Sequence, residues 1–438
     1  MNLSRAERNR SLLADNLQDW LQRLEQMQPD KIELGLGRIK QAALKLGIDA
    51  PGFRIITVAG TNGKGSTVAF ADAMLTACGY STGVYTSPHF IHFSERIVIK
   101  GSRADDDMLC RAFDAIEIAR DEIELTYFEF TTLAAIWCFV KANIDVAILE
   151  VGLGGRLDAT NAWDSEVACI SSIGIDHTDW LGDDRESIGA EKAGVARRGC
   201  ALVCGDTDAP ASIAKVAADV GANLLQRGRD FTVEAVGNDR WRYSDQQMTV
   251  DLPLPAIKGQ WACDNAAVSI CAVNTFLAGA LPVAAIEASL RQVTMTGRMQ
   301  IVEAEDTSVI LDVAHNHAAA VKLCHYLTSE KVTGQTLAVF GCMQDKDAGA
   351  IVESLSAVVD RWFIAEIDYP RAMAGAEIDQ ELQQHGVKNT QIFASVIHAV
   401  NAAVAQSGTE DRVVVLGSFH VVGPVSYTHL TLPTIYSV

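Results

Sequence analysis

Apolar positions near the start of the chain recur first at the spacing of a helix and then at that of a strand. Leu17, Trp20 and Leu24 lie three or four residues apart, which predicts an amphipathic helix. The run RIITVA at 54–59 is instead rich in β-branched residues and ends at a glycine, as a buried strand does. In the first hundred residues we predict helices near 17–24, 38–46 and 68–78 and strands at 54–59 and 82–85.

The same alternation continues to the end of the chain. Further predicted helices lie near 131–141, 262–277, 318–327 and 348–359, and further strands at 146–151, 167–173, 309–313, 336–340 and 362–365. The polar stretch 230–254 predicts a small antiparallel excursion. Apolar strands separated by helices indicate an α/β fold with a mostly parallel sheet covered on both faces. We expect two domains, residues 1–297 and 298–438.

Length and charge narrow the class of protein. A chain of 438 residues with 49% hydrophobic content can fill two cores. The net charge of −19 argues against binding to nucleic acid or to an anionic membrane, which needs clusters of Lys and Arg. The ten cysteines form no CxxC pair, so reduced thiols are expected. The apolar run at 133–140 is too short to span a bilayer, and the first residues contain no signal-peptide stretch, so a cytoplasmic protein is predicted.

The first chemical signal is the segment GTNGKGS between a predicted strand and a predicted helix. Backbone N–H groups at a helix N-terminus can hold phosphate oxygens while a lysine reaches them. The predicted ATP-binding residues are Gly60, Thr61, Asn62, Gly63, Lys64, Gly65 and Ser66. The spacing departs from the Walker pattern, because Val58 replaces its first glycine and Gly65 separates Lys64 from Ser66. A glycine-rich turn with a solvated lysine is the alternative.

Three polar side chains follow or end predicted strands of the same sheet. The carboxyl ends of parallel strands meet at one edge, so we expect these side chains beside the phosphate loop. Ser87 suits Mg²⁺ binding, although its segment also suits a plain turn. Glu150 ends an apolar strand and needs a cation, which is Mg²⁺ or Arg156. His177 would be structural in isolation, but its strand-end position favours a functional role.

Taken together, the motifs resemble a known family. They are GTNGKGS (60–66), YTSPH (85–89), TYFEF (126–130), LEVGLGGRLDATN (149–161), IDHTDWLG (175–182), EKAG (191–194), GRMQ (297–300) and LDVAHN (311–316). In this order they are similar to the folylpolyglutamate synthases and dihydrofolate synthases of the Mur-ligase superfamily. The resemblance extends to about Val422. It implies a phosphate-loop ATPase domain followed by a smaller Rossmann-like domain, with the active site in the cleft between them.

The resemblance also implies roles for single residues. Ser87, Glu150 and His177 would hold Mg²⁺. Lys192 matches a lysine carried as a carbamate, which would support a second Mg²⁺; without the family it would be taken as a surface lysine. The residues that would contact the nucleotide from the second half of the cleft are Asn265, Arg298 and Asp312, with His315 and Asn316 lining the same site.

A further part of the resemblance concerns a pterin site. The matching residues are Thr126, Tyr127, Phe128, Glu129, Leu157, Asp158 and Ala159. An aromatic pair can pack on a flat pterin ring, and packing of Tyr127 and Phe128 in the core is the alternative. The implied reaction is ATP-dependent addition of L-glutamate to dihydropteroate and to the γ-carboxylate of reduced folates through an acyl phosphate. The implied catalytic residues are Lys64, Lys192, His177 and His315, in a monomer with ATP and two Mg²⁺.

Two other functions share some of these features. An amino-acid ligase of cell-wall synthesis would have the same loop, but about 60 residues before it are too few for a nucleotide-sugar domain. A phosphate-loop binding protein without ligase activity would not need Glu150, His177 and the residues of the second domain. Two departures from the family remain, namely His317 in place of a proline and an atypical tail. We expect the residues after about Val422 to be poorly packed.

Overall fold

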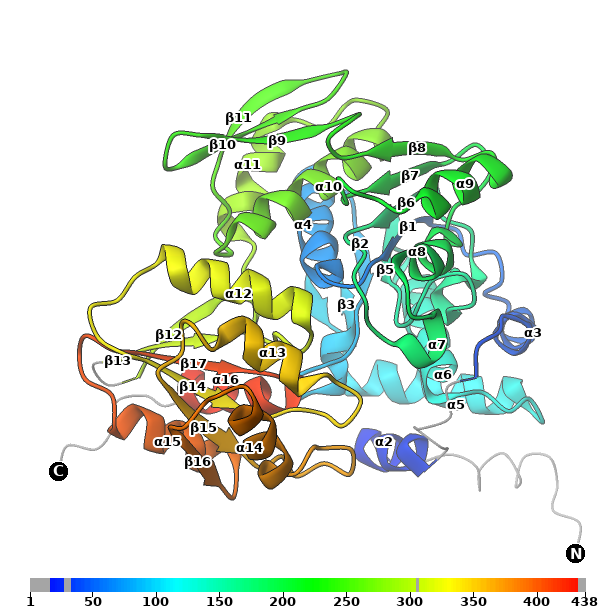
Figure 1. The fold of residues 1–438 in the computed structure, drawn as a ribbon. Helices are drawn as coiled ribbons and strands as arrows, with labels where there is room; N and C mark the ends of the chain where they lie inside the picture. The colour runs from blue at the N-terminus through cyan, green and yellow to red at the C-terminus, as the bar shows by residue number, and fades with distance from the viewer. Residues whose placement is uncertain (1–15, 27–32, 305–306, 432–438) are drawn as a thin grey trace, which may run out of the picture. The chain divides into compact units, whose positions relative to one another are not determined.

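The computed structural model describes residues 16–26, 33–304 and 307–431, with side chains up to Ser426 (Figure 1). The chain divides into two compact units. The first comprises the residues up to Leu254 together with Cys263–Val293, and the second comprises Pro255–Ala262 together with the residues from Thr294 onwards. The short segment 255–262 of the second unit is therefore inserted in the sequence between two segments of the first unit.

The first unit is built on an eight-stranded sheet in the order β4-β3-β2-β5-β1-β6-β7-β8. Its strands are β1 (Arg54–Ala59), β2 (Thr82–Tyr85), β3 (Ile97–Ile99), β4 (Ser102–Arg103), β5 (Val146–Glu150), β6 (Val167–Ile170), β7 (Ala201–Cys204) and β8 (Asn223–Gln226). From β2 to β8 all neighbours are parallel, whereas β3 and β4 add an antiparallel edge. The predicted parallel sheet is confirmed, but this antiparallel edge was not predicted.

Two apolar clusters join several helices of the first unit to its sheet. The helices are α2 (Leu17–Gln26), α3 (Gly37–Leu46), α4 (Lys64–Ala77), α5 (Asp106–Arg120), α6 (Tyr127–Ala142), α7 (Thr178–Leu181), α8 (Arg185–Ala193), α9 (Ala211–Val220), α10 (Gln260–Phe276) and α11 (Val283–Gln292). One cluster joins Trp20, Phe113 and Phe130 to strand residues such as Leu149. The other joins strand residues such as Ile170 to α8 and α9.

The predicted antiparallel excursion is a separate three-stranded sheet. Its strands are β9 (Thr232–Val236), β10 (Arg240–Ser244) and β11 (Thr249–Pro253). Alternate side chains of β10, Trp241 and Tyr243, are buried, as expected for a strand with one covered face. The turn between β9 and β10 is exposed, and Gly237 adopts a φ of 68° there. None of the candidate site residues belongs to this sheet.

The second unit has a six-stranded sheet in the order β12-β13-β17-β14-β15-β16. The strands are β12 (Gln300–Ala304), β13 (Thr307–Leu311), β14 (Thr336–Phe340), β15 (Arg361–Ala365), β16 (Thr390–Phe393) and β17 (Arg412–Leu416), and the helices are α12 (His317–Ser329), α13 (Ala348–Leu355), α14 (Gly375–Gln384), α15 (Val396–Ala405) and α16 (Phe419–Thr431). Only the β12–β13 pair is antiparallel. The core includes Phe340, Ile351 and Trp362, so this unit has its own apolar interior.

The end of the chain differs from expectation. Helix α16 continues to Thr431, and Val425 and Ser426 are both buried. The prediction of poor packing after Val422 is therefore wrong for the residues up to Ser426, because the buried face of α16 continues past Val422. The side chains after Ser426 lie outside the described residues. His317 opens α12 where the family usually has proline, and its Nδ1 lies 3.0 Å from Ser354 Oγ.

Within the described ranges, no helix combines the length and the apolar character needed to cross a bilayer.

Candidate active site

The phosphate loop connects the end of β1 to the start of α4. Gly63 is the N-cap of α4 and adopts a φ of 88°, and no side chain caps this helix end. The first N–H groups of a helix have no partner within the helix and can bind an anion. Lys64 Nζ folds back over the loop and donates to the carbonyl oxygens of Gly60 (3.1 Å) and Thr61 (3.3 Å). The loop therefore presents a helix N-terminus and an ammonium group together.

Neighbouring residues lie so close to two positions of the phosphate loop that only glycine fits there. A Cβ at Gly60 would lie 2.0 Å from Ser171 Oγ, and a Cβ at Gly63 would lie 2.4 Å from Asn265 Oδ1. Both glycines also have positive φ, which side chains disfavour. Asn265 lies on α10 in the first unit, against the phosphate loop. Asn265 therefore belongs to the same unit as the phosphate loop and not to the unit of Arg298, whereas its contact with the nucleotide stays a prediction.

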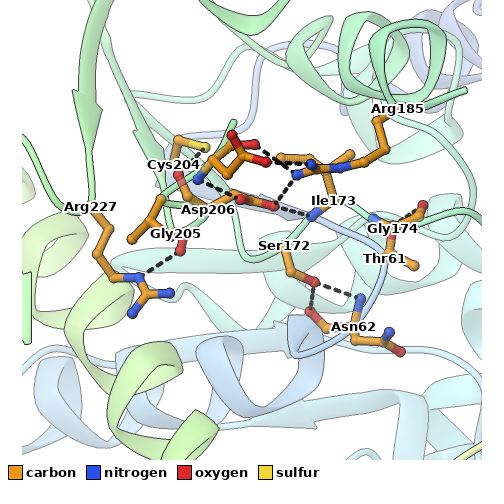
Figure 2. A network of polar contacts seen from close by, with 12 residues as sticks. Thr61, Asn62, Ser172, Ile173, Gly174, Arg185, Cys204, Gly205, Asp206 and Arg227 are labelled. Carbon is orange, nitrogen blue, oxygen red and sulfur yellow. Dashed lines mark hydrogen bonds and ion pairs between the residues drawn. The ribbon is translucent and has the colours of Figure 1, made fainter. Parts of the chain in front are cut away.

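The segment that follows β6 forms hydrogen bonds with the phosphate loop (Figure 2). Asn62 N donates to Ser172 Oγ (3.1 Å), and the Asn62 carbonyl accepts from Ser171 Oγ (2.7 Å) and Ser172 Oγ (2.9 Å). Thr61 N donates to the Ser172 carbonyl at 2.8 Å. The loop conformation is thus set by strand β6 as well as by its own glycines.

The structure brings Ser87 and Glu150 together, as predicted from their strand ends. Strands β2 and β5 are parallel neighbours, and Ser87 N donates to Glu150 Oε2 at 3.2 Å. Leu149 belongs to the cluster under α6, so the alternation of side chains turns Glu150 to the opposite face of the sheet. Arg156 forms its ion pair with Glu191 at 2.7 Å. The alternative pairing of Glu150 with Arg156 is therefore wrong.

Lys192 is buried near the end of α8, with 4% of its surface exposed, and is not the surface lysine expected from composition alone. The pKa of Lys192 is lowered to about 7, mainly by burial and also by the positive charge of Lys64, although the charges of Asp176 and Asp158 oppose this change. These electrostatic interactions place the two lysines and the two aspartates in one neighbourhood. Lys192 is thus a partly neutral amine beside the phosphate loop at neutral pH.

His177 follows Asp176 in the connection from β6 to α7. It is the N-cap of α7 and adopts a φ of 54°, which is unusual for a residue with a side chain. Its backbone N–H donates to Asp176 Oδ1 at 2.9 Å. The connection therefore holds His177 in a strained backbone conformation close to the aspartate that interacts with Lys192.

The seven predicted pterin-site residues all line one cavity of about 290 Å³ in the first unit. Its wall also includes Ser87, so the cavity reaches the Ser87–Glu150 pair. Tyr127 and Phe128 are only partly buried, and the Phe128 ring lies 5.9 Å from that of Tyr85. The two rings at the start of α6 border the cavity and also pack against the apolar core of the first unit, so the structure agrees with both interpretations of these residues.

Two carboxylates shape this cavity in different ways. Asp158 is fully buried and accepts from the N–H groups of Gly152 (3.0 Å) and Leu153 (2.9 Å), so it fixes the glycine-rich loop; burial nevertheless raises its pKa. Glu129 Oε2 accepts from Thr126 N (2.8 Å) in a capping box at the start of α6. Glu129 Oε1 is buried and has no hydrogen-bond partner in the structure. It is therefore a buried acceptor without a partner in a residue that lines the cavity.

Arg96 lines the same cavity and was not found from the sequence. Its Nε donates to His89 Nδ1 at 2.8 Å, and its guanidinium carbon lies 5.6 Å from the centre of the Tyr127 ring. Among the described residues that line the cavity, Arg96 is the one basic side chain. It directly precedes β3 in the unpredicted antiparallel edge, so no sequence pattern placed it beside Ser87.

The candidate residues of the second unit also gather in one place. Asp312 follows β13 and accepts from the N–H groups of Met299 (3.0 Å) and Ala314 (2.9 Å). Burial raises the pKa of Asp312, although the charge of Arg298 opposes this. The Phe419 ring lies 5.4 Å from the Arg298 guanidinium carbon and 6.3 Å from the His315 ring. Asn316 caps α12 by accepting from Ala319 N at 3.0 Å, so it has a structural role.

Comparisons with known proteins identify the family of the chain. Residues 58–273 match the family described as Mur ligase middle domain, and residues 297–419 match Mur ligase, glutamate ligase domain. The dihydrofolate synthase/folylpolyglutamate synthase of Escherichia coli (strain K12) is 43% identical over 415 residues, covering 94% of this chain and 95% of that protein. The protein of the same name from Haemophilus influenzae is 37% identical over 426 residues, covering 93% of this chain and 96% of that protein.

Solved structures show the same similarity. The structure of E. coli FolC in complex with DHPP and ADP has a TM-score of 0.88 at 42% identity and covers 95% of this chain and 98% of that chain. A bifunctional folylpolyglutamate synthase/dihydrofolate synthase with Mn, AMPPNP and L-glutamate bound has a TM-score of 0.87 at 41% identity, covering 96% and 99%. The chain therefore belongs to the dihydrofolate synthase/folylpolyglutamate synthase family of ATP-dependent Mur-type ligases.

Proposed function

We propose that this protein uses ATP to join L-glutamate to the carboxylate of dihydropteroate, and to the γ-carboxylate of reduced folates. The observation that carries the proposal is the cavity at the start of α6. Its aromatic wall suits a flat ring, its Arg96 suits a carboxylate, and Ser87 connects it to Glu150 on the strand beside the phosphate loop. A ring-bearing acid bound there would direct its carboxylate towards the nucleotide.

The residues present fit a nucleotide with a divalent cation. At Gly60 and Gly63 a Cβ would collide with neighbouring side chains, so the loop keeps the close backbone approach that phosphate binding requires. Within the described part of the chain, no three His, Cys, Asp or Glu side chains form a metal cluster. Mg²⁺ commonly uses one or two carboxylates together with substrate phosphates, and the buried Glu150 beside Ser87 suits such a site. Bound Mg²⁺ would neutralise charge on the phosphates.

The chain's own side chains have distinct tasks in this reaction. Lys64 lies over the loop and would hold the transferring phosphoryl group while the acceptor carboxylate attacks its phosphorus, releasing ADP. The product is an acyl phosphate. The amine of glutamate then attacks the acyl carbon, phosphate leaves, and an amide remains. Arg96 and the aromatic wall would hold the acceptor through both steps, so that no covalent bond to the protein is needed.

We also propose that Lys192 is carried as a carbamate. Its buried, partly neutral amine can attack the carbon of CO₂ and lose a proton, giving an anion in place of a cation. That change would remove the repulsion with Lys64 and would provide, with His177, oxygen and nitrogen ligands for a second Mg²⁺. The number of metal sites and the carbamate rest on this reasoning and on the family resemblance.

In the second unit, the residues proposed to take part in the reaction are Arg298, Asp312 and His315. Their clustering near Phe419 supports a shared task, and the family resemblance suggests contact with the nucleotide. A monomeric state and a cytoplasmic location complete the proposal, and both rest on the sequence alone.

Replacing Lys64 tests the proposed function. We expect Lys64→Ala to abolish the ADP release that dihydropteroate and glutamate together drive in the wild-type protein, because the phosphoryl group loses its cationic partner. A coupled assay of ADP measures this. Lys215→Ala is the matched control, since Lys215 is exposed and pairs only with Asp219 on α9. Near-normal turnover in Lys64→Ala would contradict the assignment of the loop.

The same assay separates the proposal from its alternatives. A ligase of this kind releases little ADP until both the acceptor and glutamate are present. ADP release without an acceptor would instead indicate a nucleotide-binding protein that hydrolyses ATP.

A further inference from the structure

A polar network lies at the ends of β6 and β7, outside the candidate residues, and connects them to the phosphate loop (Figure 2). Asp206 follows β7 and is its centre. Asp206 Oδ2 accepts from the backbone N–H of Ile173 at 3.1 Å and from Arg185 Nη2 at 3.0 Å. The Asp206 side chain is 15% exposed, so these contacts are largely shielded from water. One carboxylate oxygen thus joins the segment after β6 to the start of α8.

The segment that Asp206 holds leads directly to His177. Ile173 is followed by Gly174, whose N–H and carbonyl each form a 3.1 Å hydrogen bond with the Thr61 hydroxyl. The chain is therefore fixed at two consecutive residues, by Asp206 and by the phosphate loop. Three residues later His177 adopts its positive φ. Such a conformation is unfavourable for a residue with a side chain and persists only where the surroundings enforce it.

The second partner of Asp206 belongs to the helix that carries Lys192. Arg185 is the first residue of α8, and Lys192 lies two turns further along. Asp206 therefore connects the segment leading to His177 with the helix bearing Lys192. Both connections depend on the same carboxylate, so their relative placement is set at Asp206. Close packing supports this rigidity, because a Cβ at Gly205 would lie 2.6 Å from the Ser171 carbonyl oxygen.

We propose that Asp206 is a positioning residue for the metal site, which sets the segment Ile173–His177 against α8 so that His177 and Lys192 face the nucleotide together. The inference rests on the proposed function, in which these two residues hold Mg²⁺. Asp206 itself touches neither substrate nor metal. Residues that orient metal ligands in this way commonly change metal affinity by about 10- to 100-fold when they are replaced.

The test replaces Asp206 with asparagine, which keeps the shape of the side chain and removes its charge. Mn²⁺ is titrated onto the full-length protein with AMPPNP present, and free Mn²⁺ is followed by electron paramagnetic resonance. We expect Asp206→Asn to weaken Mn²⁺ binding about tenfold. Hydrogen exchange of the peptide spanning 171–177 should become faster in the same variant, because Ile173 N–H loses its charged acceptor. Arg185→Gln, which removes the positive charge that pairs with Asp206, should also weaken Mn²⁺ binding.

Asp208→Asn is the matched control. Asp208 pairs with Arg185 Nη1 at 2.9 Å, but its side chain is 94% exposed and makes no contact with Ile173. It should leave both measurements unchanged. The inference is overturned if Asp206→Asn behaves like Asp208→Asn in either measurement. The variant His177→Ala distinguishes a failure of this inference from a failure of the proposed function. If His177→Ala leaves Mn²⁺ binding unchanged, the metal role of His177 is contradicted. If His177→Ala weakens Mn²⁺ binding but Asp206→Asn does not, only the role of Asp206 is contradicted.

Discussion

At the residue scale, Lys192 shows how burial turns an ordinary side chain into a reactive one. Its amine is removed from water and lies near a second lysine, so its pKa falls from 10.5 to about 7. A lysine with this pKa is about half neutral at pH 7, and the neutral form is the one that reacts with CO₂. The chemistry of the site therefore depends on its depth in the fold as well as on its identity.

The carbamate of Lys192 should form as pH rises through 7. The pKa of the folded protein's amine is lowered, so the neutral fraction increases between pH 6 and pH 8, whereas an exposed lysine would remain charged. At a fixed pressure of ¹³CO₂, we expect a carbamate carbon signal in the nuclear magnetic resonance spectrum that grows over this range together with ligase activity. Lys192→Arg should lack the signal, and a wild-type spectrum without it at pH 8 would refute the carbamate.

The role of a residue could be predicted from the sequence only where a continuous motif or the end of a predicted strand contains it. Gly60–Ser66 form one continuous motif, and Ser87 and Glu150 follow from the rule that parallel strand ends meet. Asp206 gave no such signal, because its partners Ile173 and Arg185 are brought to it by the pairing of β6 with β7. The burial of Lys192 was equally hidden, since it results from packing of the loop after β5 on α8.

At the element scale, three strands were predicted with their observed bounds, whereas the starts of two helices were missed. The runs 54–59, 82–85 and 336–340 match β1, β2 and β14, because β-branched residues between turn signals define buried strands well. Helices α4 and α6 each begin four residues before the predicted start. The first turn of α4 contains glycine and polar residues that hide its periodicity, and α6 starts at a capping box that was read only as a ligand site.

The start of α6 should control binding of the acceptor and leave ATP binding unchanged. Phe128→Ala removes one aromatic wall of the cavity, and we expect the KM for dihydropteroate to rise about fivefold, since loss of stacking costs about 1 kcal/mol. The KM for ATP should stay the same. Trp137→Phe on the same helix, away from the cavity, is the control. An unchanged KM for dihydropteroate in Phe128→Ala would show that the cavity does not hold the acceptor.

At the scale of the whole molecule, the α/β class and the two sheets follow from the alternation of apolar runs. The sequence did not predict that residues 255–262 belong to the second unit, because a short loop gives no signal of the unit on which it packs. The antiparallel strands β3 and β4 are too short to show a pattern. These omissions matter, since the first of these strands directly follows Arg96 and α10 places Asn265 against the phosphate loop.

Separate cores in the two units should be visible in thermal unfolding. The apolar clusters of the first unit share no residue with that of the second, so we expect calorimetry to depart from a single two-state transition. AMPPNP with Mg²⁺ should raise the midpoint of the transition of the first unit, because a ligand stabilises the state that binds it. A single two-state transition without ligand would contradict this independence.

The exposed turn at Gly237 offers a practical opportunity for engineering. A Cβ there would meet no atom within 4 Å, and its three-stranded sheet carries no candidate residue of the active site. The chain has ten free cysteines, of which Cys78, Cys110, Cys200 and Cys324 are partly exposed, so thiol chemistry would label several places at once. A short peptide tag inserted at this turn would instead attach a fluorophore or a solid support at one defined position, far along the chain from the phosphate loop.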